Sequence, residues 1–332
     1  MSKIAGMESA SFLGGIDLGG TKILSLVVDD DLEIAGRDYR LTEAAQGLDA
    51  VVQRMVDSLR AAAGGRRLRA VGISTPGPCD VRRGIVTSPP NLPGWKDVPL
   101  AKLIGDAFGL PAWIENDGNA GAIAEHRVGA GKGFDHVILV TLGTGIGGGL
   151  ILDGRIYHGA SGSSGEIGHM KLTDDGPACS CGRRGCLEAL ASGRYLGELA
   201  LAIVKEEPRG ILARLTPAGE TPTAETLSDA AAAGDERARE AIARAGGYLA
   251  EGIVNLVDIF NPQQIVLAGS LRKLGPLYLD AAFARVKSDP FPQSAADVEL
   301  VEAMLEDDAA AIGAAIVAMD RLSGNVDPLF RT

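Results

Sequence analysis

The fold is decided by the stretch Phe12-Leu-Gly-Gly-Ile-Asp17-Leu-Gly-Gly-Thr21-Lys22-Ile-Leu-Ser-Leu-Val-Val28 and by a second stretch of the same design, His136-Val-Ile-Leu-Val-Thr-Leu142-Gly-Thr-Gly-Ile-Gly-Gly-Gly-Leu150-Ile-Leu-Asp153. In each, an apolar strand enters a turn rich in Gly and Thr and returns as another apolar strand. A weak internal duplication of this kind predicts two similar lobes that face a cleft.

The rest of the chain alternates strands with helices, which favours an α/β architecture. A third strand with Ile34 and Tyr39 is expected to follow the first pair. Helical spacing of apolar residues predicts helices at 48–63, 118–128, 192–206, 235–260 and 309–322. Short apolar runs predict strands at 70–74, 112–115, 136–141, 150–153 and 264–269.

Length and composition indicate a two-domain protein that binds a small ligand. The chain has 332 residues, of which 46% are hydrophobic, and single cores usually split at this size. The formal net charge is -11 and the sequence pI is about 4.9. This acidity argues against a nucleic-acid surface. A polyanionic substrate such as ATP would need local hydrogen-bond donors or a metal ion.

The sequence predicts a cytoplasmic protein without a membrane partner. Residues 1–11 lack the apolar core of a secretory signal. The longest apolar run, residues 309–319, is shorter than the ~20 residues that span a bilayer. Four cysteines without an export signal point to a reducing compartment, and to metal binding rather than disulfides.

The first glycine-rich turn, Asp17-Leu-Gly19-Gly20-Thr21-Lys22, has the groups needed to hold a phosphate. Its glycines let the backbone approach a ligand, so that N–H groups point at phosphate oxygens. Thr21 adds a hydroxyl, Lys22 adds a cation, and Asp17 could hold Mg²⁺ through water. The alternative is an ordinary hairpin turn, in which Gly-Gly is common.

The second turn, Gly143-Thr144-Gly145-Ile-Gly-Gly148, matches the G-x-G-x-x-G pattern of dinucleotide-binding proteins. That pattern requires a helix after the glycines. Here the next residues, Leu150-Ile-Leu-Asp-Gly-Arg-Ile-Tyr157, predict a strand, a turn and a strand, which excludes the nicotinamide-dehydrogenase interpretation. No G-x-x-x-x-G-K-[ST] segment is present. The two turns are therefore interpreted as phosphate-binding hairpins, one in each lobe.

Asp117 is the candidate general base, because it follows the end of a strand beside Asn116. A carboxylate at this place can accept a proton from a substrate hydroxyl. The alternative is a helix N-cap, for which Asp and Asn are favoured residues. The two roles are compatible, because a helix N-terminus also stabilises the ionised carboxylate.

A metal site is predicted from Glu166-Ile-Gly-His169 and Cys179-Ser-Cys181-Gly-Arg-Arg-Gly-Cys186-Leu-Glu188. Zn²⁺ takes four N or S ligands, and this run holds one His and three Cys. Such a closed site is structural, and it would fix both glutamates in space. The alternatives are separate buried thiols or a disulfide, His158 in place of His169 as the fourth ligand, and glutamates that are only solvated surface charges.

Taken together, these motifs resemble the ROK family of bacterial sugar kinases and repressors, and in particular its ATP-dependent glucokinases. Pro76-Gly77-Pro78 and Asn91-Leu-Pro-Gly-Trp95 fit the family as well. The matches occur in family order and extend from Asp17 to the region of Gly269. The resemblance implies an actin-like, hexokinase-type (ribonuclease H-like) fold with two duplicated lobes and ATP in the cleft between them.

The resemblance also implies roles for individual residues. The small lobe would comprise residues 1–117 and the C-terminal helix at 309–332, and the large lobe residues 118–308 with the zinc-binding loop. Asp117 would be the catalytic base. The sugar hydroxyls would contact Gly77, Asn116, Asp117, Glu166, His169 and Glu188. Zinc would be held by His169, Cys179, Cys181 and Cys186. ATP and Mg²⁺ would be held by Asp17, Gly19, Gly20, Thr21, Lys22, Gly143, Thr144, Gly145 and Gly269. The family is often dimeric, so a homodimer is expected.

Three positions depart from the family pattern. Leu267-Ala268-Gly269-Ser270 stands where a Gly-Gly pair is usual on the adenine side, and Ser163-Ser164 replaces a segment that often carries His. Cys79 follows Pro-Gly-Pro where an aliphatic residue is common. Close to the expected sugar pocket, it would be either an oxidation-sensitive thiol or a quiet buried one.

The sequence therefore predicts a kinase that transfers the γ-phosphoryl group of MgATP to a hexose, with glucose as the expected substrate. Fructose, mannose, N-acetylmannosamine and glucosamine remain alternatives, because they share most hydroxyls with glucose. A regulatory sugar sensor of the same family would need a DNA-binding segment. The dozen residues before the first strand leave no room for one, and the chain is acidic.

Overall fold

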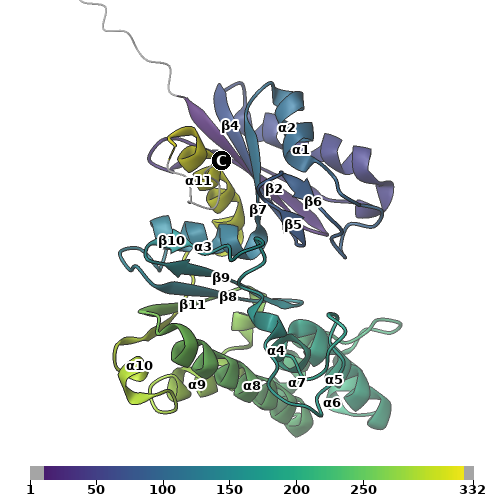
Figure 1. Ribbon diagram of the computed structural model, residues 1–332. Coiled ribbons are helices and arrows are strands. Elements are labelled where there is room, and N and C mark those ends of the chain that lie inside the picture. Colours follow the sequence, from purple (N-terminus) through teal and green to yellow (C-terminus); the bar gives the residue numbers. More distant parts are fainter. Residues whose placement is uncertain (1–10, 325–332) are drawn as a thin grey trace, which may run out of the picture.

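Two five-stranded sheets with the same strand order form the core of the protein (Figure 1). In the first sheet the order is β3-β2-β1-β4-β7, with β1 antiparallel to β2 and parallel to β4. In the second it is β10-β9-β8-β11-β12, with β8 antiparallel to β9 and parallel to β11. The repeated order confirms the predicted duplication. The strands of the first sheet are β1 (Phe12–Leu18), β2 (Lys22–Val28), β3 (Ile34–Leu41), β4 (Leu68–Thr75) and β7 (Ala112–Asn116). Those of the second are β8 (Val137–Leu142), β9 (Ile146–Leu152), β10 (Arg155–Ile156), β11 (Gln264–Ala268) and β12 (Glu299–Glu302).

This computed structural model describes residues 11–324. Residues 1–10, where no export signal was found, and residues 325–332, assigned above to the small lobe, lie outside the described part. A small hairpin of β5 (Cys79–Asp80) and β6 (Ile85–Val86) extends from the first sheet. Among residues 11–324 there is no helix with both the length and the apolar character needed to cross a bilayer.

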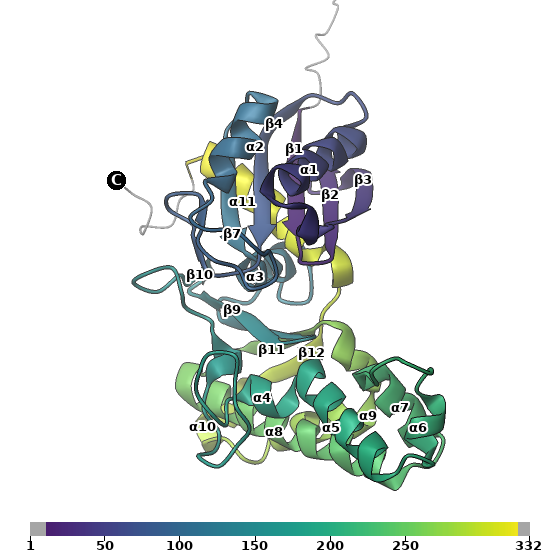
Figure 2. The ribbon, with the colours of Figure 1, turned by 90° about the vertical axis from the view of Figure 1, so that its right-hand side faces the viewer.

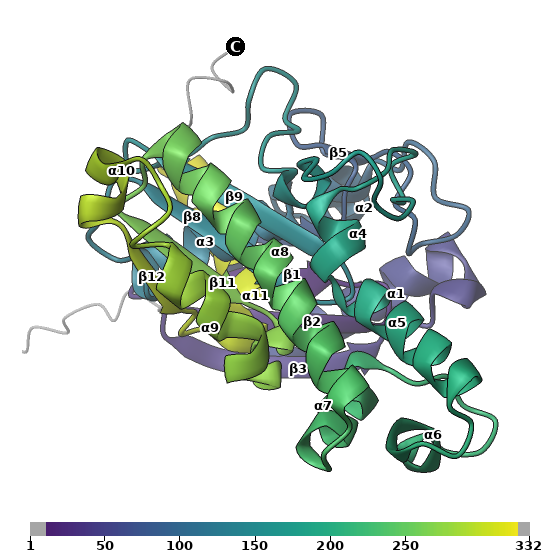
Figure 3. The same cartoon turned by 90° about the horizontal axis from the view of Figure 1, so that it is seen from below.

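Helices separate and cover the sheets in layers, as Figures 1 and 2 show. On one face of the first sheet lie α1 (Leu48–Ala63) and α2 (Leu100–Phe108). Between the two sheets lie α3 (Asp117–Val128) and α11 (Ala309–Leu322), which pack on each other. The far side of the second sheet carries α4 (Leu187–Ala191), α5 (Gly193–Glu206), α6 (Ile211–Leu215), α7 (Ala224–Ala232), α8 (Glu236–Phe260), α9 (Pro276–Arg285) and α10 (Pro292–Asp297). Figure 3 shows the long helix α8 running beside α9 across this layer.

Glycines let α11 lie directly on the first sheet. A Cβ atom added to Gly72 on β4 would come 1.7 Å from the Ala314 carbonyl oxygen, and one on Gly15 of β1 would come 2.0 Å from that of Ala311. Every residue of α11 from Ala311 to Ala318 is buried. The last described helix therefore completes the first lobe in space, although it is far from β1 in sequence.

The buried side chain of Glu125 on α3 joins the two chain crossings between the lobes. Its carboxylate accepts hydrogen bonds from the N–H groups of Ala130 (2.8 Å), Met304 (3.0 Å) and Leu305 (2.8 Å). Ala130 follows α3 on the way to β8, and Met304 and Leu305 lead from β12 to α11. One carboxylate therefore satisfies backbone donors on both connections.

The second turn is shorter than the sequence predicted. The prediction extended it to Gly149, whereas β9 already begins at Ile146, so three consecutive glycines belong to a strand. Close neighbours occupy the space that side chains would need: a Cβ atom on Gly149 would come 2.6 Å from that of Ala122 on α3, and one on Gly148 would come 2.5 Å from Cδ1 of Ile167. The edge strand β12, the hairpin of β5 and β6, and the helices α2, α4, α6, α7, α9 and α10 were not predicted.

Candidate active site

The candidate catalytic residues meet where the parallel strands of the first sheet end. In open α/β sheets, ligands bind at the carboxyl ends of the strands. Asp17 lies near the end of β1, Ser74 near the end of β4, and Asn116 closes β7. The Ser74 hydroxyl donates to Oδ1 of Asp17 at 3.1 Å. Gly77 lies beside Asn116, since a Cβ atom on it would come 3.3 Å from Asn116 Nδ2.

The N-cap of α3 is Asn116, which corrects the alternative interpretation of Asp117 as the cap. Asn116 Oδ1 accepts from the N–H groups of Gly118 (3.0 Å) and Asn119 (3.3 Å). Asp117 is the first helical residue, and its Oδ1 also accepts from the Gly118 N–H at 2.8 Å. The Asp117 carboxylate therefore stays in the positive field of a helix N-terminus while Asn116 caps the helix.

Protein atoms and charges around Asp117 raise its pKa. Part of the Asp117 residue is exposed to solvent. The protein around its carboxyl nevertheless excludes water, and this desolvation raises the pKa of the carboxyl. The charge of Glu166 raises this pKa further, and the hydrogen bond from Gly118 opposes the rise. Glu166 belongs to the segment before the 3₁₀ helix Ile167–His169, so the structure brings the two predicted residues together from different lobes.

Asp17 is the second carboxyl of this group. Burial raises its pKa from the usual 3.8 to about 6, and the charge of Asp117 contributes to the rise. The Lys22 ammonium at the end of the first turn lies 3.1 Å from Oδ1 of Asp307, an exposed residue just before α11. The first turn itself is a tight hairpin, in which the Gly19 N–H donates to the Lys22 carbonyl at 2.8 Å. Asn91 packs against this turn, because a Cβ atom on Gly20 would come 2.7 Å from Cβ of Asn91.

Cys79 lies near these carboxylates. Burial, followed by the charges of Glu115 and Asp117, raises the pKa of its thiol to about 12. A thiol with so high a pKa stays protonated at neutral pH and is a poor nucleophile. The raised pKa favours the interpretation of Cys79 as a quiet thiol, although its side chain is only half-buried.

Sequence reasoning missed Glu115, and it considered His158 only as a zinc ligand. His158 Nε2 lies 2.9 Å from Glu115 Oε2, and both side chains are buried. His158 is thus engaged away from the cysteines, which corrects the alternative in which it replaced His169. The signal was present in the sequence: an acidic residue inside the buried strand at 112–115 requires a partner.

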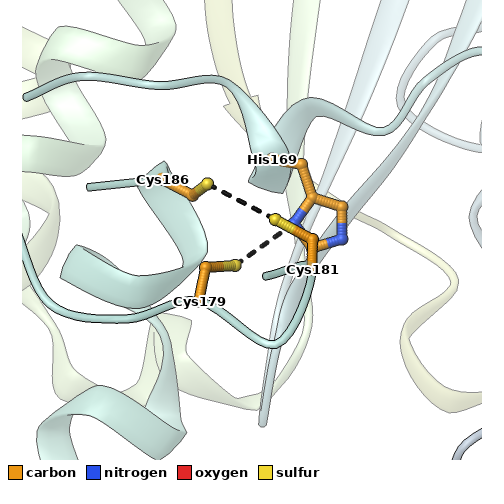
Figure 4. A group of neighbouring side chains, drawn as sticks. All are labelled: His169, Cys179, Cys181 and Cys186. Atoms are coloured by element: carbon orange, nitrogen blue, oxygen red, sulfur yellow. Dashed lines mark hydrogen bonds between the residues drawn. The ribbon is translucent and has the colours of Figure 1, made fainter. Parts of the chain in front are cut away.

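The four predicted metal ligands converge. Figure 4 shows His169, Cys179, Cys181 and Cys186 facing one another. Their ligand atoms all lie within 4.8 Å of one another. His169 Nδ1 is 3.5 Å from Cys179 Sγ, and Cys181 Sγ is 3.7 Å from Cys186 Sγ. A tetrahedral zinc ion with Zn–S bonds of about 2.3 Å separates its sulfur ligands by about 3.8 Å, so the donor set fits zinc in both chemistry and spacing.

The other side of His169 faces the site. Its Nε2 lies 3.9 Å from Oε2 of Glu166. The Arg183 guanidinium donates to the His169 carbonyl at 2.6 Å, which ties the cysteine loop to the same turn. The loop that brings the three cysteines together thus also holds the segment with Glu166, a carboxylate that acts on Asp117.

Glu188 lies against the second turn. Its Oε2 accepts from the Ile146 N–H at 3.1 Å, and its Oε1 accepts from the Ser180 hydroxyl at 3.1 Å. In the turn, the Gly143 N–H donates to the Gly145 carbonyl at 3.0 Å. Gly269, after β11, packs on the same turn, because a Cβ atom on it would come 2.3 Å from the Leu142 carbonyl oxygen. The structure thus gathers Gly143, Gly145, Glu188 and Gly269.

A cavity of about 620 Å³ opens beside this second turn. Its size is in the range of small-molecule and cofactor sites. Gly143 and Thr144 form one wall, α5 and α7 form others, and the 3₁₀ helix Ser270–Leu274 closes the far side. The sequence did not reveal most of these lining residues, because they come from helices far apart in the chain and carry no shared motif.

Comparison with known proteins places this geometry in a family. The glucokinase of Thermotoga maritima is 34% identical over 310 residues, which cover 93% of this chain and 98% of that protein. The xylose repressor of Bacillus subtilis is 31% identical over 319 residues, which cover 94% of this chain and 78% of the repressor. The structure of a ROK family glucokinase from Streptomyces griseus in complex with glucose and AMPPNP is 32% identical, with a TM-score of 0.78 and coverage of 93% and 99%. The model of the ROK family matches residues 13–321, and this chain belongs to the ROK family.

Proposed function

We propose that this protein is an ATP-dependent glucose kinase that transfers the γ-phosphoryl group of ATP to the 6-hydroxyl of glucose. The observation that carries this proposal is the position of Asp117, a carboxylate in the first turn of α3 at the end of β7, where Asn116 caps the helix. The glucokinase relatives, one of them solved with glucose and an ATP analogue, support the choice of substrates.

In the proposed mechanism, Asp117 accepts the proton of the sugar hydroxyl as that oxygen attacks the γ-phosphorus in line, and the bond from this phosphorus to the bridging oxygen of the β-phosphate breaks to release ADP. Its raised pKa makes it a stronger base than an ordinary carboxylate. Asn116, Gly77, Glu166 and His169 would orient the sugar hydroxyls from two lobes. Phosphoryl transfer depends mostly on positioning and charge neutralisation, which is what such a set of residues supplies.

The nucleotide would lie along the second lobe. The 620 Å³ cavity fits its nucleoside part, and the backbone N–H groups of the two glycine turns are suited to phosphate oxygens. Asp17 would hold Mg²⁺, since its buried carboxyl accepts a side-chain hydrogen bond from Ser74 at Oδ1 and carboxylate oxygens are preferred ligands of this hard cation. When bound, Mg²⁺ neutralises phosphate charge. The Lys22 ammonium would then leave the Asp307 carboxylate and contact the phosphates instead.

We further propose that Zn²⁺ occupies the His169–Cys179–Cys181–Cys186 cluster as a structural ion. All four positions of the tetrahedron are filled by protein ligands, which leaves none for a catalytic water. The ion would hold Glu166 and His169 in place for the sugar. This role rests on the donor geometry and on the contact between His169 and Glu166.

Several wider expectations are kept as part of the proposal. The division into lobes at residues 117 and 118, with 309–332 added to the first, agrees with the packing of α11 on the first sheet. A cytoplasmic homodimer is proposed on the family resemblance. The outer helical layer of the chain exposes apolar side chains that such a dimer could cover, among them Ile259 (67% exposed) and Phe291 (65% exposed).

The test is a coupled assay of ADP release with MgATP and a panel of hexoses: glucose, mannose, fructose, glucosamine and N-acetylmannosamine. We expect the highest kcat/KM with glucose. Asp117→Asn should lower kcat by ~10²–10⁴-fold, because the proton acceptor is lost, while glucose still binds by calorimetry. Near-normal turnover in this variant would remove Asp117 from the mechanism.

A second candidate function, a sugar sensor without turnover, is favoured by the repressor relatives, among them the xylose repressor of Bacillus subtilis. Sugar binding without turnover on any hexose of the panel would support it.

A further inference from the structure

The buried pair of Glu115 and His158 joins the two halves of the proposed sugar site. His158 Nε2 lies 2.9 Å from Glu115 Oε2, and the side chains are 2% and 3% exposed. Glu115 is the last residue but one of β7, in the first sheet. His158 follows β10 of the second sheet, in the segment that leads to Glu166. The pair therefore connects elements of both lobes at the level of the site.

On the side of the first lobe, Glu115 fixes the start of α3. Its Oε1 accepts from the Asn116 N–H at 3.0 Å and from Asn119 Nδ2 at 3.0 Å. Asn116 in turn caps the helix that begins with Asp117. A shift of Glu115 would move the backbone and the cap that orient the proposed base.

On the side of the second lobe, His158 anchors a closed loop. The Ser164 N–H donates to the His158 carbonyl at 3.3 Å, and the Ser164 hydroxyl donates to the Tyr157 carbonyl. Glu166 follows two residues later. The Arg82 guanidinium, from the segment between β5 and β6, donates to the Ala160 carbonyl of the same loop at 3.0 Å. That contact is exposed, whereas the Glu115–His158 contact is buried.

A buried pair of this kind is poorly explained by stability alone. Removing a carboxylate and an imidazole from water is costly, and apolar residues of similar volume often stabilise a fold as well or better. A desolvated, directional contact is better suited to fixing a relative position. We propose that Glu115 and His158 are positioning residues of hexose phosphorylation, which hold the Asn116–Asp117 end of β7 in register with the loop that carries Glu166. This inference rests on the proposed function and adds two residues to it.

The test separates sugar kinetics from nucleotide kinetics. We would measure kcat, KM for glucose and KM for ATP in Glu115→Gln, His158→Ala, His158→Gln and the double variant Glu115→Gln/His158→Ala. A misplacement of about 1 Å costs ~10²-fold, so His158→Ala should lower kcat/KM for glucose by ~10–100-fold. The KM for ATP should change by less than about threefold, because the cavity beside the second turn is built from other elements.

Conservative variants keep the test informative if His158→Ala folds poorly. His158→Gln retains an N–H group that can donate to Glu115, so it should recover a large part of the loss. If the two residues act as a pair, the double variant should lose much less than the product of the two single losses. Losses that multiply would overturn the pairing.

A matched control is His136→Gln, because His136 also faces a carboxylate, Asp153 at 3.7 Å, but at an exposed site. We expect its kinetics to stay within about twofold of wild type. Wild-type glucose kinetics in His158→Ala, or equal changes in the KM for glucose and for ATP that follow a fall in Tm, would overturn the inference.

Failure of the proposed function would appear differently, as a wild type that turns over no hexose. The pair would then be judged by calorimetric glucose affinity, which we expect to be about tenfold weaker in His158→Ala. An equal Kd in wild type and variant would overturn the inference, and a wild type that binds no sugar would overturn both proposals.

Discussion

At the scale of single residues, the two carboxyls Asp17 and Asp117 share one negative environment, and this has a measurable consequence for stability. The pKa of Asp17 is raised from 3.8 to about 6. Between these values the folded protein holds a proton that the unfolded chain has lost, so the free energy of unfolding falls as pH rises from about 4 to 6. The effect is on the order of 2–3 kcal/mol.

Asp17→Asn should remove this dependence, because an amide does not titrate. Urea unfolding of the protein without nucleotide or Mg²⁺, at several pH values from 4 to 7, should show the variant gaining on wild type as pH rises through this window. In Asp117→Asn, the loss of stability with rising pH should occur at lower pH than in wild type, because the charge of Asp117 contributes to the raised pKa of Asp17. Parallel pH profiles for wild type and Asp17→Asn would contradict the assignment.

At the scale of elements, the contact between α11 and the first sheet depends on the absence of side chains. A Cβ atom on Gly72 would meet the Ala314 carbonyl at 1.7 Å, so Gly72→Ala should force α11 away from β4. We expect a loss of about 1–3 kcal/mol in the free energy of unfolding, measured by denaturant titration. Gly247→Ala on α8 is the control: nothing lies within 4 Å of the added atom, so it should stabilise by about 0.5–1 kcal/mol. Similar effects of the two substitutions would argue against close packing of α11.

The cysteine loop makes a second prediction at this scale. If zinc holds it, the purified protein should contain about one zinc per chain, and a chelator should lower the Tm and raise the KM for glucose together. Cys181→Ser should lose the metal, whereas Cys79→Ser, which changes a thiol outside the cluster, should keep it. Full sugar affinity in a metal-free preparation would separate the metal from the site.

The same scale shows what the sequence could and could not predict. The strands β1 and β8 and the helix α11 were predicted because each is a largely apolar run, and the helix α1 because its apolar residues recur at helical spacing. Asp117 was singled out because it follows the end of a strand, and the four candidate metal ligands because of their spacing; the structure brings those four side chains together. The start of β9 was not predicted, because Gly147 to Gly149 join the strand by pairing with β8 and pack closely against other parts of the chain, which local preference does not reveal. Glu115 was missed because its partner is 43 residues away.

At the scale of the whole molecule, the duplication explains why the two sheets have the same strand order, while their surroundings differ. The two sheets have the same strand order and each carries a glycine turn, yet the proposed base Asp117 and the buried Asp17 lie at the end of the first sheet, whereas the 620 Å³ cavity lies beside the turn of the second. The duplication was predicted from the two strand–turn–strand stretches. The path of the chain through α3, Glu125 and α11 was not, because it depends on contacts between residues far apart in the chain, such as Glu125 and Leu305, which are 180 positions apart.

The position of α11 also bears on how the protein is made. The N-terminal part of the chain emerges first from the ribosome, so the strands of the first sheet are exposed early. They lack the helix that covers one of their faces until residues 309–322 have also emerged. The second sheet, with all its strands between residues 137 and 302, receives its full set first. We therefore expect the second lobe to fold first, although the strands of the first sheet are translated before those of the second. Nascent chains stalled before Ala309 should resist protease in the second lobe and be cut in the first, and early protection of residues 12–116 would contradict this order.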